Sequence, residues 1–249
     1  MKIILNEKEY SLNALENVIV DQKSPTLTLN IVSKYLMNEG MTKKEVKNEL
    51  NTLMAKGYPF YNAIKWDSII DKIVNKVFKK GVPIHIINEI TVTIGELEAI
   101  RKLNNLRLEK LAFVLLIYAK IYNIRNSNTL YWVNSPYKDI FEDANIKVTK
   151  KMQAQMIHKL VEKEMIECSV IVDCNNLKVL YHDNESDSHM TINDFRNFVL
   201  NYLKWRDEKI INCNRCASLI EKKGNKKKYC NVCAKEIKNE QNQFYKKKN

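Results

Sequence analysis

Apolar residues recur every three or four positions between residues 24 and 81, which is the spacing of amphipathic helices. A glycine follows each of the three periodic stretches, and Thr42 with Glu45 has the spacing of a capping box at the start of the second. The pattern therefore predicts a unit of three helices within residues 1–82. We expect residues 1–12, "MKIILNEKEYSL", to form a short strand or an ordered arm.

Between residues 106 and 182 the pattern alternates between helical and strand-like stretches. The order is helix, short strand, short helix, a helix capped by Thr149, and two β-rich runs around the turn residues Asn175 and Asn176. This order is expected of a winged helix-turn-helix, in which the third helix enters the DNA major groove and the hairpin lies over the backbone. We therefore expect a mainly α-helical chain with a winged-helix-like domain over residues 83–190.

The helix after Thr149 has an apolar and a polar arc when it is placed on a helical wheel. The apolar arc holds Met152, Met156, Ile157 and Leu160. The polar arc holds Lys150, Lys151, Ala154, Gln155, His158 and Lys159. Amides and cations can contact base edges and phosphates, so the candidate nucleic-acid contacts are Lys150, Lys151, Gln155 and His158. Contact with a protein, or a scaffold role, is the alternative, since the helix ends in the acidic stretch "EKEMIE".

An acidic stretch at residues 182–189, "HDNESDSH", follows the predicted hairpin. Its possible metal ligands are His182, Asp183, Glu185, Asp187 and His189. A solvated linker is favoured over a divalent-cation site, because no rigid element is expected to fix these side chains. Beyond it, Thr191 and Asp194 have capping-box spacing, so a connecting helix is predicted over residues 191–209.

Four of the six cysteines form two CxxC pairs with thirteen residues between them. The pairs are Cys213 with Cys216 and Cys230 with Cys233. Two such turns can complete a tetrahedron of thiolates around Zn²⁺, and four thiolates leave no open position for catalysis. We therefore expect a structural zinc site in a small zinc ribbon whose fold depends on the metal. A redox dithiol or an iron–sulfur cluster is the alternative.

Positive charge is concentrated around the same cysteines. Residues 209–249 carry twelve Lys or Arg and three Glu, in a chain whose net charge is +12. Five lysines lie between the two pairs: Lys222, Lys223, Lys226, Lys227 and Lys228. With only Glu221 nearby they suit contact with phosphates, so we expect a basic zinc-binding module over residues 210–249 that binds nucleic acid. DNA is favoured over RNA; RNA, a protein partner and a merely solvated face stay open.

Three stretches resemble proteins of phages and mobile elements from low-GC Gram-positive bacteria. "KKYCNVCAKE" is similar to their C-terminal zinc knuckles, and "IVSKYLMNEGMTKKEVKNEL" to helical modules beside primase and replication-initiator domains. The stretch from "EKLAFVLLIYAKIYN" to "KKMQAQMIHKLVEKEMI" resembles the winged helix of phage replisome-organiser proteins. The resemblance implies a replication accessory or a transcription regulator. It also leaves open a phage protein that binds and inhibits a host protein or ribonucleoprotein complex, such as a CRISPR defence complex.

Other classes of function lack a supporting pattern. The sequence contains no phosphate-cradling glycine loop, paired catalytic carboxylates or nucleophile constellation, so we expect a protein that is not an enzyme. No signal peptide is recognisable, and the longest strongly apolar run, residues 111–119, is too short for a membrane span. We therefore expect no membrane partner and a cytoplasmic location in a bacterial host. In that reducing compartment Cys168 and Cys174 are expected to be buried thiols.

Overall fold

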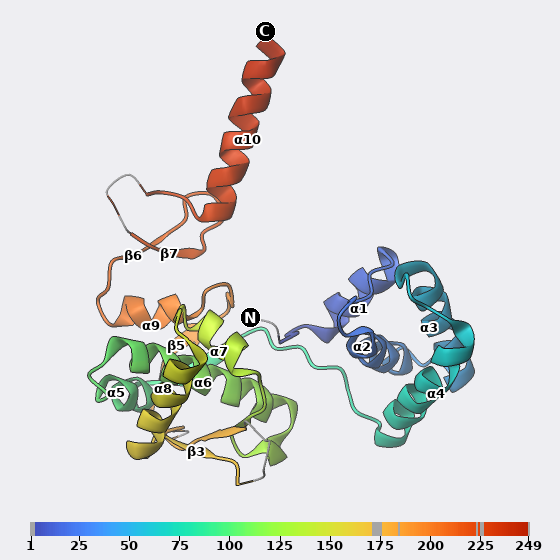
Figure 1. Cartoon of the computed structure of the whole chain (residues 1–249), viewed down its shortest axis with the longest axis horizontal. Coiled ribbons are helices and arrows are strands. Elements are labelled where there is room, and N and C mark those ends of the chain that lie inside the picture. The colour runs from blue at the N-terminus through green and yellow to red at the C-terminus, as the bar shows by residue number, and fades with distance from the viewer. Residues whose placement is uncertain (1–2, 171–175, 184, 223, 225–226, 249) are drawn as a thin grey trace. The chain divides into compact units, whose positions relative to one another are not determined.

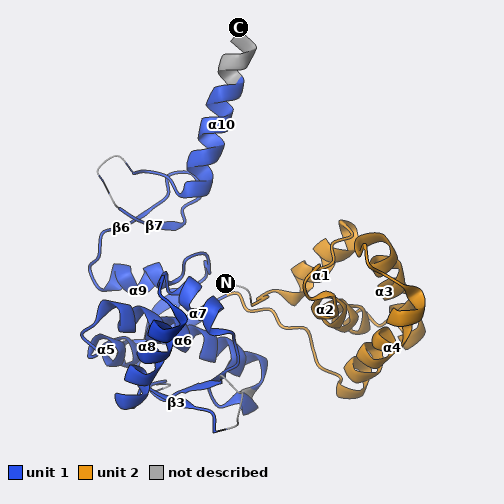
Figure 2. Ribbon diagram, in the orientation of Figure 1, with its two compact units in different colours: residues 1–2, 89–249 blue, residues 3–88 orange. Residues whose placement is uncertain are grey.

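The computed structural model describes residues 3–170, 176–183, 185–222, 224 and 227–248 (Figure 1). The chain forms two compact units, one of residues 3–88 and one that begins at residue 89 (Figure 2). The described part is mainly helical, with ten α-helices and three small sheets. None of the helices in that part has the length and apolar character that crossing a membrane requires.

The first unit is a cluster of four helices around an apolar core. It consists of α1 (Glu7–Glu16), α2 (Pro25–Asn38), α3 (Lys43–Gly57) and α4 (Ala63–Lys80). Fully buried side chains of this core include Leu29, Val32, Leu50, Met54 and Ile70. The predicted capping box of Thr42 and Glu45 starts α3, and Gly81 ends α4 in the left-handed region with a φ of 55°.

Helix α1 corrects the prediction of a strand or arm at residues 1–12. The Asn6 side chain accepts a hydrogen bond at 3.0 Å from the backbone N–H three residues on, which satisfies a free donor in the first turn. Glu7 is buried, and its carboxylate receives hydrogen bonds from Lys34 of α2 at 3.1 Å and from the backbone N–H of His85 at 2.9 Å. The unit therefore contains a fourth helix, held by polar contacts that have no periodic signature.

The second unit is built around α6 (Leu106–Arg125), most of whose residues are buried. The elements before it are β1 (Ile90–Thr93) and α5 (Ile94–Arg101). The elements after it are β2 (Trp132–Val133), α7 (Tyr137–Asp143), α8 (Lys150–Glu162), β3 (Ile166–Cys168), β4 (Leu177–Val179), β5 (Ser188–Ile192) and α9 (Val199–Trp205). Three strands form an antiparallel sheet in the order β2-β4-β3, and β1 pairs with β5.

Helix α9 packs on α6 through a buried carboxylate. Glu109 of α6 is fully buried and accepts a hydrogen bond from the hydroxyl of Tyr202 at 2.8 Å. Arg206, which follows α9, forms an ion pair with the same carboxylate. The ring of Tyr202 also lies 5.3 Å from the ring of Phe113, measured between centroids. These contacts fix the segment that leads into the C-terminal module.

The pairing of β1 with β5 overturns the start of the predicted connecting helix. Thr191 and Ile192 lie opposite Thr91 and Ile90 in the sheet, so Thr191 does not cap a helix. Asp194 forms an ion pair with Arg196 instead, and the helix of this region is limited to α9. The prediction failed because the partner strand lies far away in the sequence, where local periodicity carries no information about it.

The cysteine at the end of β3 also differs from its prediction. Cys168 is exposed rather than buried, because the hairpin leaves the core at this point, and Val170 is 98% exposed. Cys174 and the predicted turn residue Asn175 lie outside the described residues.

The C-terminal part consists of a two-stranded sheet and a long helix. Strand β6 (Ile210–Asn212) pairs antiparallel with β7 (Leu219–Glu221), and α10 (Asn231–Lys248) follows. Its small core comprises Cys213, Ile220 and Cys233, with Ile211, Cys216 and Cys230 packed against them. Cysteines make up most of this core, and Ile211 and Ile220 are its large apolar side chains.

Candidate metal centre

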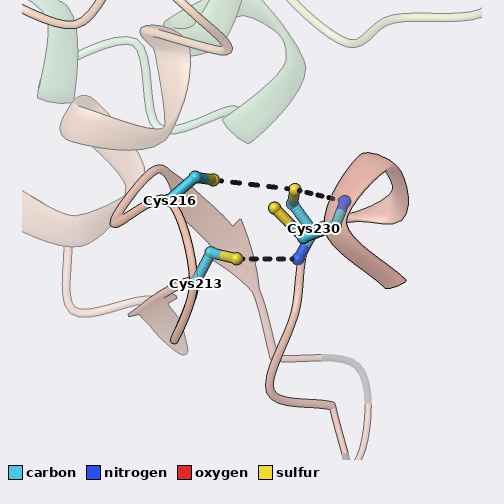
Figure 3. A group of neighbouring side chains, drawn as sticks. Cys213, Cys216 and Cys230 are labelled. Carbon is cyan, nitrogen blue, oxygen red and sulfur yellow. Dashed lines mark hydrogen bonds between the residues drawn. The ribbon is translucent and has the colours of Figure 1, made fainter. Parts of the chain in front are cut away.

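Four cysteine sulfurs gather between the β6–β7 hairpin and the start of α10. The ligand atoms of Cys213, Cys216, Cys230 and Cys233 all lie within 4.8 Å of one another. Figure 3 shows Cys213 and Cys216 on one side and Cys230 on the other, with their side chains directed toward a common centre. The fold thus brings together the four residues that the sequence predicts as one ligand set.

Local backbone turns explain why each pair converges. In the first pair, the N–H of Ala217 donates to the carbonyl of Cys213 at 2.9 Å, and Ala217 has a positive φ of 58°. The N–H of Cys213 in turn donates to the carbonyl of Ser218 at 2.8 Å, which closes the turn. In the second pair, Cys230 immediately precedes α10 and Cys233 lies in its first turn, so the i, i+3 spacing directs both side chains to one side.

Hydrogen-bond donors surround the sulfur atoms. The N–H of Cys230 donates to Sγ of Cys213 at 3.2 Å, and the N–H of Cys233 donates to Sγ of Cys230 at 3.4 Å. The hydroxyl of Ser218 lies 3.0 Å from Sγ of Cys216. Such donors stabilise the thiolate, which is the form of cysteine that binds a metal.

The pKa values of these thiols shift in different directions. Hydrogen bonding, above all from the backbone N–H of Cys216, lowers the pKa of Cys213 to about 6. Hydrogen bonding to Ser218 lowers the pKa of Cys216, whereas burial, followed by the neighbouring sulfurs, raises the pKa of Cys233. Thiolates this close repel one another, so a bound cation would allow all four to ionise.

The spacing of the sulfurs fits a tetrahedral ion. A Zn–S bond of about 2.3 Å places two sulfurs of an ideal tetrahedron about 3.8 Å apart. The sulfurs of Cys216 and Cys230 are 3.8 Å apart. Among the described residues no other His, Cys, Asp or Glu joins the group. The four thiols therefore form a closed donor set that could hold a metal ion, and both Zn²⁺ and iron accept such a set.

The loop between the two cysteine pairs carries the predicted phosphate-binding lysines. Lys222 and Lys228 are exposed and Lys227 is half-buried, whereas Lys223 and Lys226 lie outside the described residues. In the part of the chain that the structure describes, Lys222, Lys227 and Lys228 form no ion pair. Their charge is therefore available to an external anion.

Arg215 has a role that the sequence did not suggest. Its guanidinium donates to the carboxylate of Glu240 at 2.8 Å and lies 3.9 Å from that of Glu236. Both acids belong to α10, so the contact connects the first cysteine turn to this helix. Their i, i+4 spacing, which places them on one face of α10, is the signal that could have identified the contact.

Helix α8 presents its predicted contact residues to solvent. The exposed set includes Lys150, Lys151, Gln155 and His158. Nδ1 of His158 lies 3.3 Å from the carboxylate of Glu162, so the acidic end of the helix engages this ring. Met152, predicted on the apolar arc, is 41% exposed, because it lies in the first turn, one turn before the buried Met156.

A hollow of about 160 Å³ lies beside this face, between α8 and the start of α6. Its lining includes Asn105, Arg107, Leu108, Gln155 and Lys159. No sequence pattern identifies Asn105 or Arg107 as part of this surface, because only the packing of α6 against α8 brings them close to Gln155. The exposed Arg107 and Lys159 add positive charge to this surface.

Part of the acidic connector is built into the fold, which corrects the prediction of a solvated linker. The N–H of Asp183 donates to the buried carboxylate of Glu96 at 3.1 Å, and the Asp183 carboxylate accepts from the N–H of Glu185 at 2.8 Å. The His182 ring stacks on Tyr131 with 3.7 Å between centroids, and burial lowers the pKa of His182. The described residues place no metal-ligand group here.

No family model, curated protein or solved structure matches this chain. Its function is therefore inferred from the arrangement of its own residues.

Proposed function

We propose that the protein binds nucleic acid, with DNA as the preferred form, through a winged helix formed by α6 to β4 and a zinc-stabilised basic module at residues 210–249. The observation that carries the proposal is the setting of α8. This helix follows α6, β2 and α7, precedes a hairpin in a sheet of order β2-β4-β3, and exposes its polar N-terminal half. In that order of elements a winged helix presents its recognition helix to the major groove.

The side chains on α8 suit contact with a duplex. Lys150 and Lys151 place two cations in the first helical turn, where they can reach phosphates. Gln155, one turn later, carries an amide that can pair with the edge of an adenine. We infer that the two lysines supply affinity and that Gln155 supplies base preference, with Lys159 and Arg107 as flanking phosphate contacts.

The cysteine module supports affinity that does not depend on base sequence. Zn²⁺ bound to the four thiolates would fix the two turns that flank the lysine loop, and the loop would then hold its charges close together. Phosphate contacts of this kind bind all sequences similarly. The zinc has a structural role in this proposal. In this proposal the protein acts as a phage-type replication accessory or transcription regulator in the bacterial cytoplasm.

Binding of the full-length, metal-loaded protein to a labelled duplex tests the role of α8. Replacing Lys150 and Lys151 by Gln should lower the affinity about 5- to 30-fold and reduce the slope of log K against log salt by about 2, since each phosphate contact contributes about 0.9. A control variant with Lys102→Gln and Lys204→Gln removes the same charge from exposed positions outside α8. It should leave the slope unchanged.

Gln155→Ala should weaken binding to preferred sequences more than binding to random duplex. Equal losses from the Lys150/Lys151 variant and its control would mean that only total charge matters. That result, or the absence of any salt-dependent binding, would contradict the proposal.

A protein partner is the second candidate, and the β3–β4 hairpin favours it. Lys178 lies 3.6 Å from Glu167 across the two strands, so its charge is already paired. Val170 beyond them exposes an apolar side chain. A nuclease-resistant, stoichiometric partner that is lost with Val170→Asp but retained by the Lys150/Lys151 variant would favour this function over DNA binding.

A further inference from the structure

Four lysines of α4 form one row along the exposed side of the first unit. We define this lysine stripe as Lys65, Lys72, Lys76 and Lys79. At about 100° per residue their spacings of seven, four and three place them within about 60° of one another on the helix. All four are exposed, and the buried side of α4 holds Ile70, Ile73, Val74 and Val77.

The acidic residues of α4 lie on a different side and are already paired. Nζ of Lys47 in α3 lies 2.9 Å from a carboxylate oxygen of Asp67 and 2.9 Å from one of Asp71. A single lysine outside the stripe therefore forms ion pairs with both acids and offsets one of their two negative charges. No ion pair of a stripe lysine occurs among the residues that the structure describes. The stripe thus keeps its full positive charge.

A further lysine extends the positive surface from the neighbouring helix. Nζ of Lys43, at the start of α3, lies 3.4 Å from the Asn75 side chain and 5.8 Å from the centroid of the Phe78 ring. Lys80 adds one more exposed cation at the end of α4. Like charges at i, i+3 and i, i+4 repel along a helix, so the isolated unit is under an electrostatic penalty that a bound polyanion would relieve.

We propose that the lysine stripe binds the phosphate backbone of nucleic acid. From Lys65 to Lys79 the helix rises about 21 Å. At about 3.4 Å per phosphate, one DNA strand presents about six phosphates over that length. All four stripe residues are lysines, which contact phosphates rather than base edges, so the stripe is expected to bind independently of base sequence. This surface belongs to a different compact unit from α8 and the cysteine module, and it does not require their proposed role to be correct.

The salt dependence of DNA binding by the full-length chain tests the stripe. A variant with Lys72, Lys76 and Lys79 replaced by Gln should reduce the slope of log K against log salt by about 2 to 3. The matched control replaces three exposed lysines of the same unit that lie outside α4, namely Lys8, Lys23 and Lys56. The control should change the slope by less than about 1. Far-UV circular dichroism of both variants shows whether the helices are retained.

Equal changes in the two triple variants would overturn the inference, because they would report total charge rather than a site. An unchanged DNA slope with lost binding to vesicles of an anionic phospholipid would overturn it in favour of a membrane surface. The Lys150/Lys151 variant, measured alongside, separates this inference from the proposed function. If only the stripe variant reduces the slope of log K against log salt, the stripe is supported and the proposed role of α8 is contradicted. If only the Lys150/Lys151 variant reduces the slope, the role of α8 is supported and the stripe is contradicted.

Discussion

Gly57 closes α3 at a place where a side chain has no room. A Cβ atom at this position would lie 2.7 Å from the backbone carbonyl oxygen of Val18 and 3.0 Å from Cγ2 of Val20. Val18 has a positive φ of 54°, and Val20 is buried. Gln22 also donates a hydrogen bond to the carbonyl of Gly57 at 3.0 Å. The segment that joins α1 to α2 therefore cannot easily move away from the end of α3.

We expect Gly57→Ala to lower the free energy of unfolding by about 1–3 kcal/mol, because the added methyl group overpacks a contact with rigid backbone. Urea denaturation followed by circular dichroism measures the change. Gly224→Ala is the control, since nothing lies within 4 Å of a Cβ atom there, and its effect should stay within about 0.5 kcal/mol. Equal urea midpoints for the two variants would contradict this expectation, because they would show that the segment between α1 and α2 moves to accommodate the added methyl group.

Single residues whose role depends on near neighbours in the sequence were predictable. The caps at Thr42 and Thr149 and the turn within each CxxC pair follow from spacings of a few residues, and the structure contains all of them. Met152 and Cys168 were assigned wrongly, because the burial of a side chain depends on which distant segment covers it. The contact between Arg215 and α10 was missed for the same reason.

At the scale of elements, the packing of α9 on α6 depends on one buried charge. Both partners of Glu109 come from the α9 region: the hydroxyl of Tyr202 and the guanidinium of Arg206. Hydrogen bonding and an opposite charge offset the cost of burying a carboxylate. Burial, together with the hydrogen bond to Glu109, raises the pKa of Tyr202, so the phenol stays protonated as a donor at neutral pH.

Glu109→Ala should therefore lower the free energy of unfolding by about 3–5 kcal/mol, since it leaves the Arg206 charge without its buried partner. The matched control is Glu208→Ala, which removes an exposed acid lying 3.6 Å from the same guanidinium. The control should cost less than about 1 kcal/mol. Denaturation curves of the two variants measure the difference, and comparable losses would mean that burial of the Glu109 carboxylate is unimportant.

Among the elements, the helices with strong apolar periodicity and the short strands β2, β3 and β4 were predicted, whereas α1 and β5 were not. The stretches that became α2, α3, α4, α6 and α8 carry their apolar face in local sequence. Helix α1 begins with an Asn6 cap and a buried Glu7, neither of which contributes to periodicity. Strand β5 exists only because β1 pairs with it, and that pairing joins segments far apart in the chain.

At the scale of the whole molecule, the C-terminal module differs from the rest in what stabilises it. The four-helix unit and the α6 region have cores of large apolar side chains, whereas the module has Ile211 and Ile220 together with four cysteines. Because this core is so small, we expect that the segment needs a bound metal to offset its conformational entropy. The local spacing of the cysteines indicated this arrangement, but no sequence pattern identifies the ion.

Removal of the metal should unfold the module and leave α1 to α9 folded. Elemental analysis of the purified protein should give one Zn²⁺ per chain. After treatment with a chelator, hydrogen exchange should become fast in residues 210–222 and 227–235 while α6 keeps its protection. Cys233→Ser should reproduce this pattern without a chelator, and Cys168→Ser, a substitution outside the cluster, should not. Unchanged exchange after chelation would show that the module folds without a metal.

The buried Glu109 also determines where the chain can be divided for separate study. A fragment that ends before α9 would leave the buried carboxylate of Glu109 without its hydrogen-bond and ion-pair partners. A recombinant fragment with that boundary should therefore misfold or precipitate. A fragment that ends just after Arg206 keeps both partners of Glu109 and omits only the cysteine module. The few residues between Arg206 and β6 are therefore the natural cutting point for obtaining the α5–α9 region by itself.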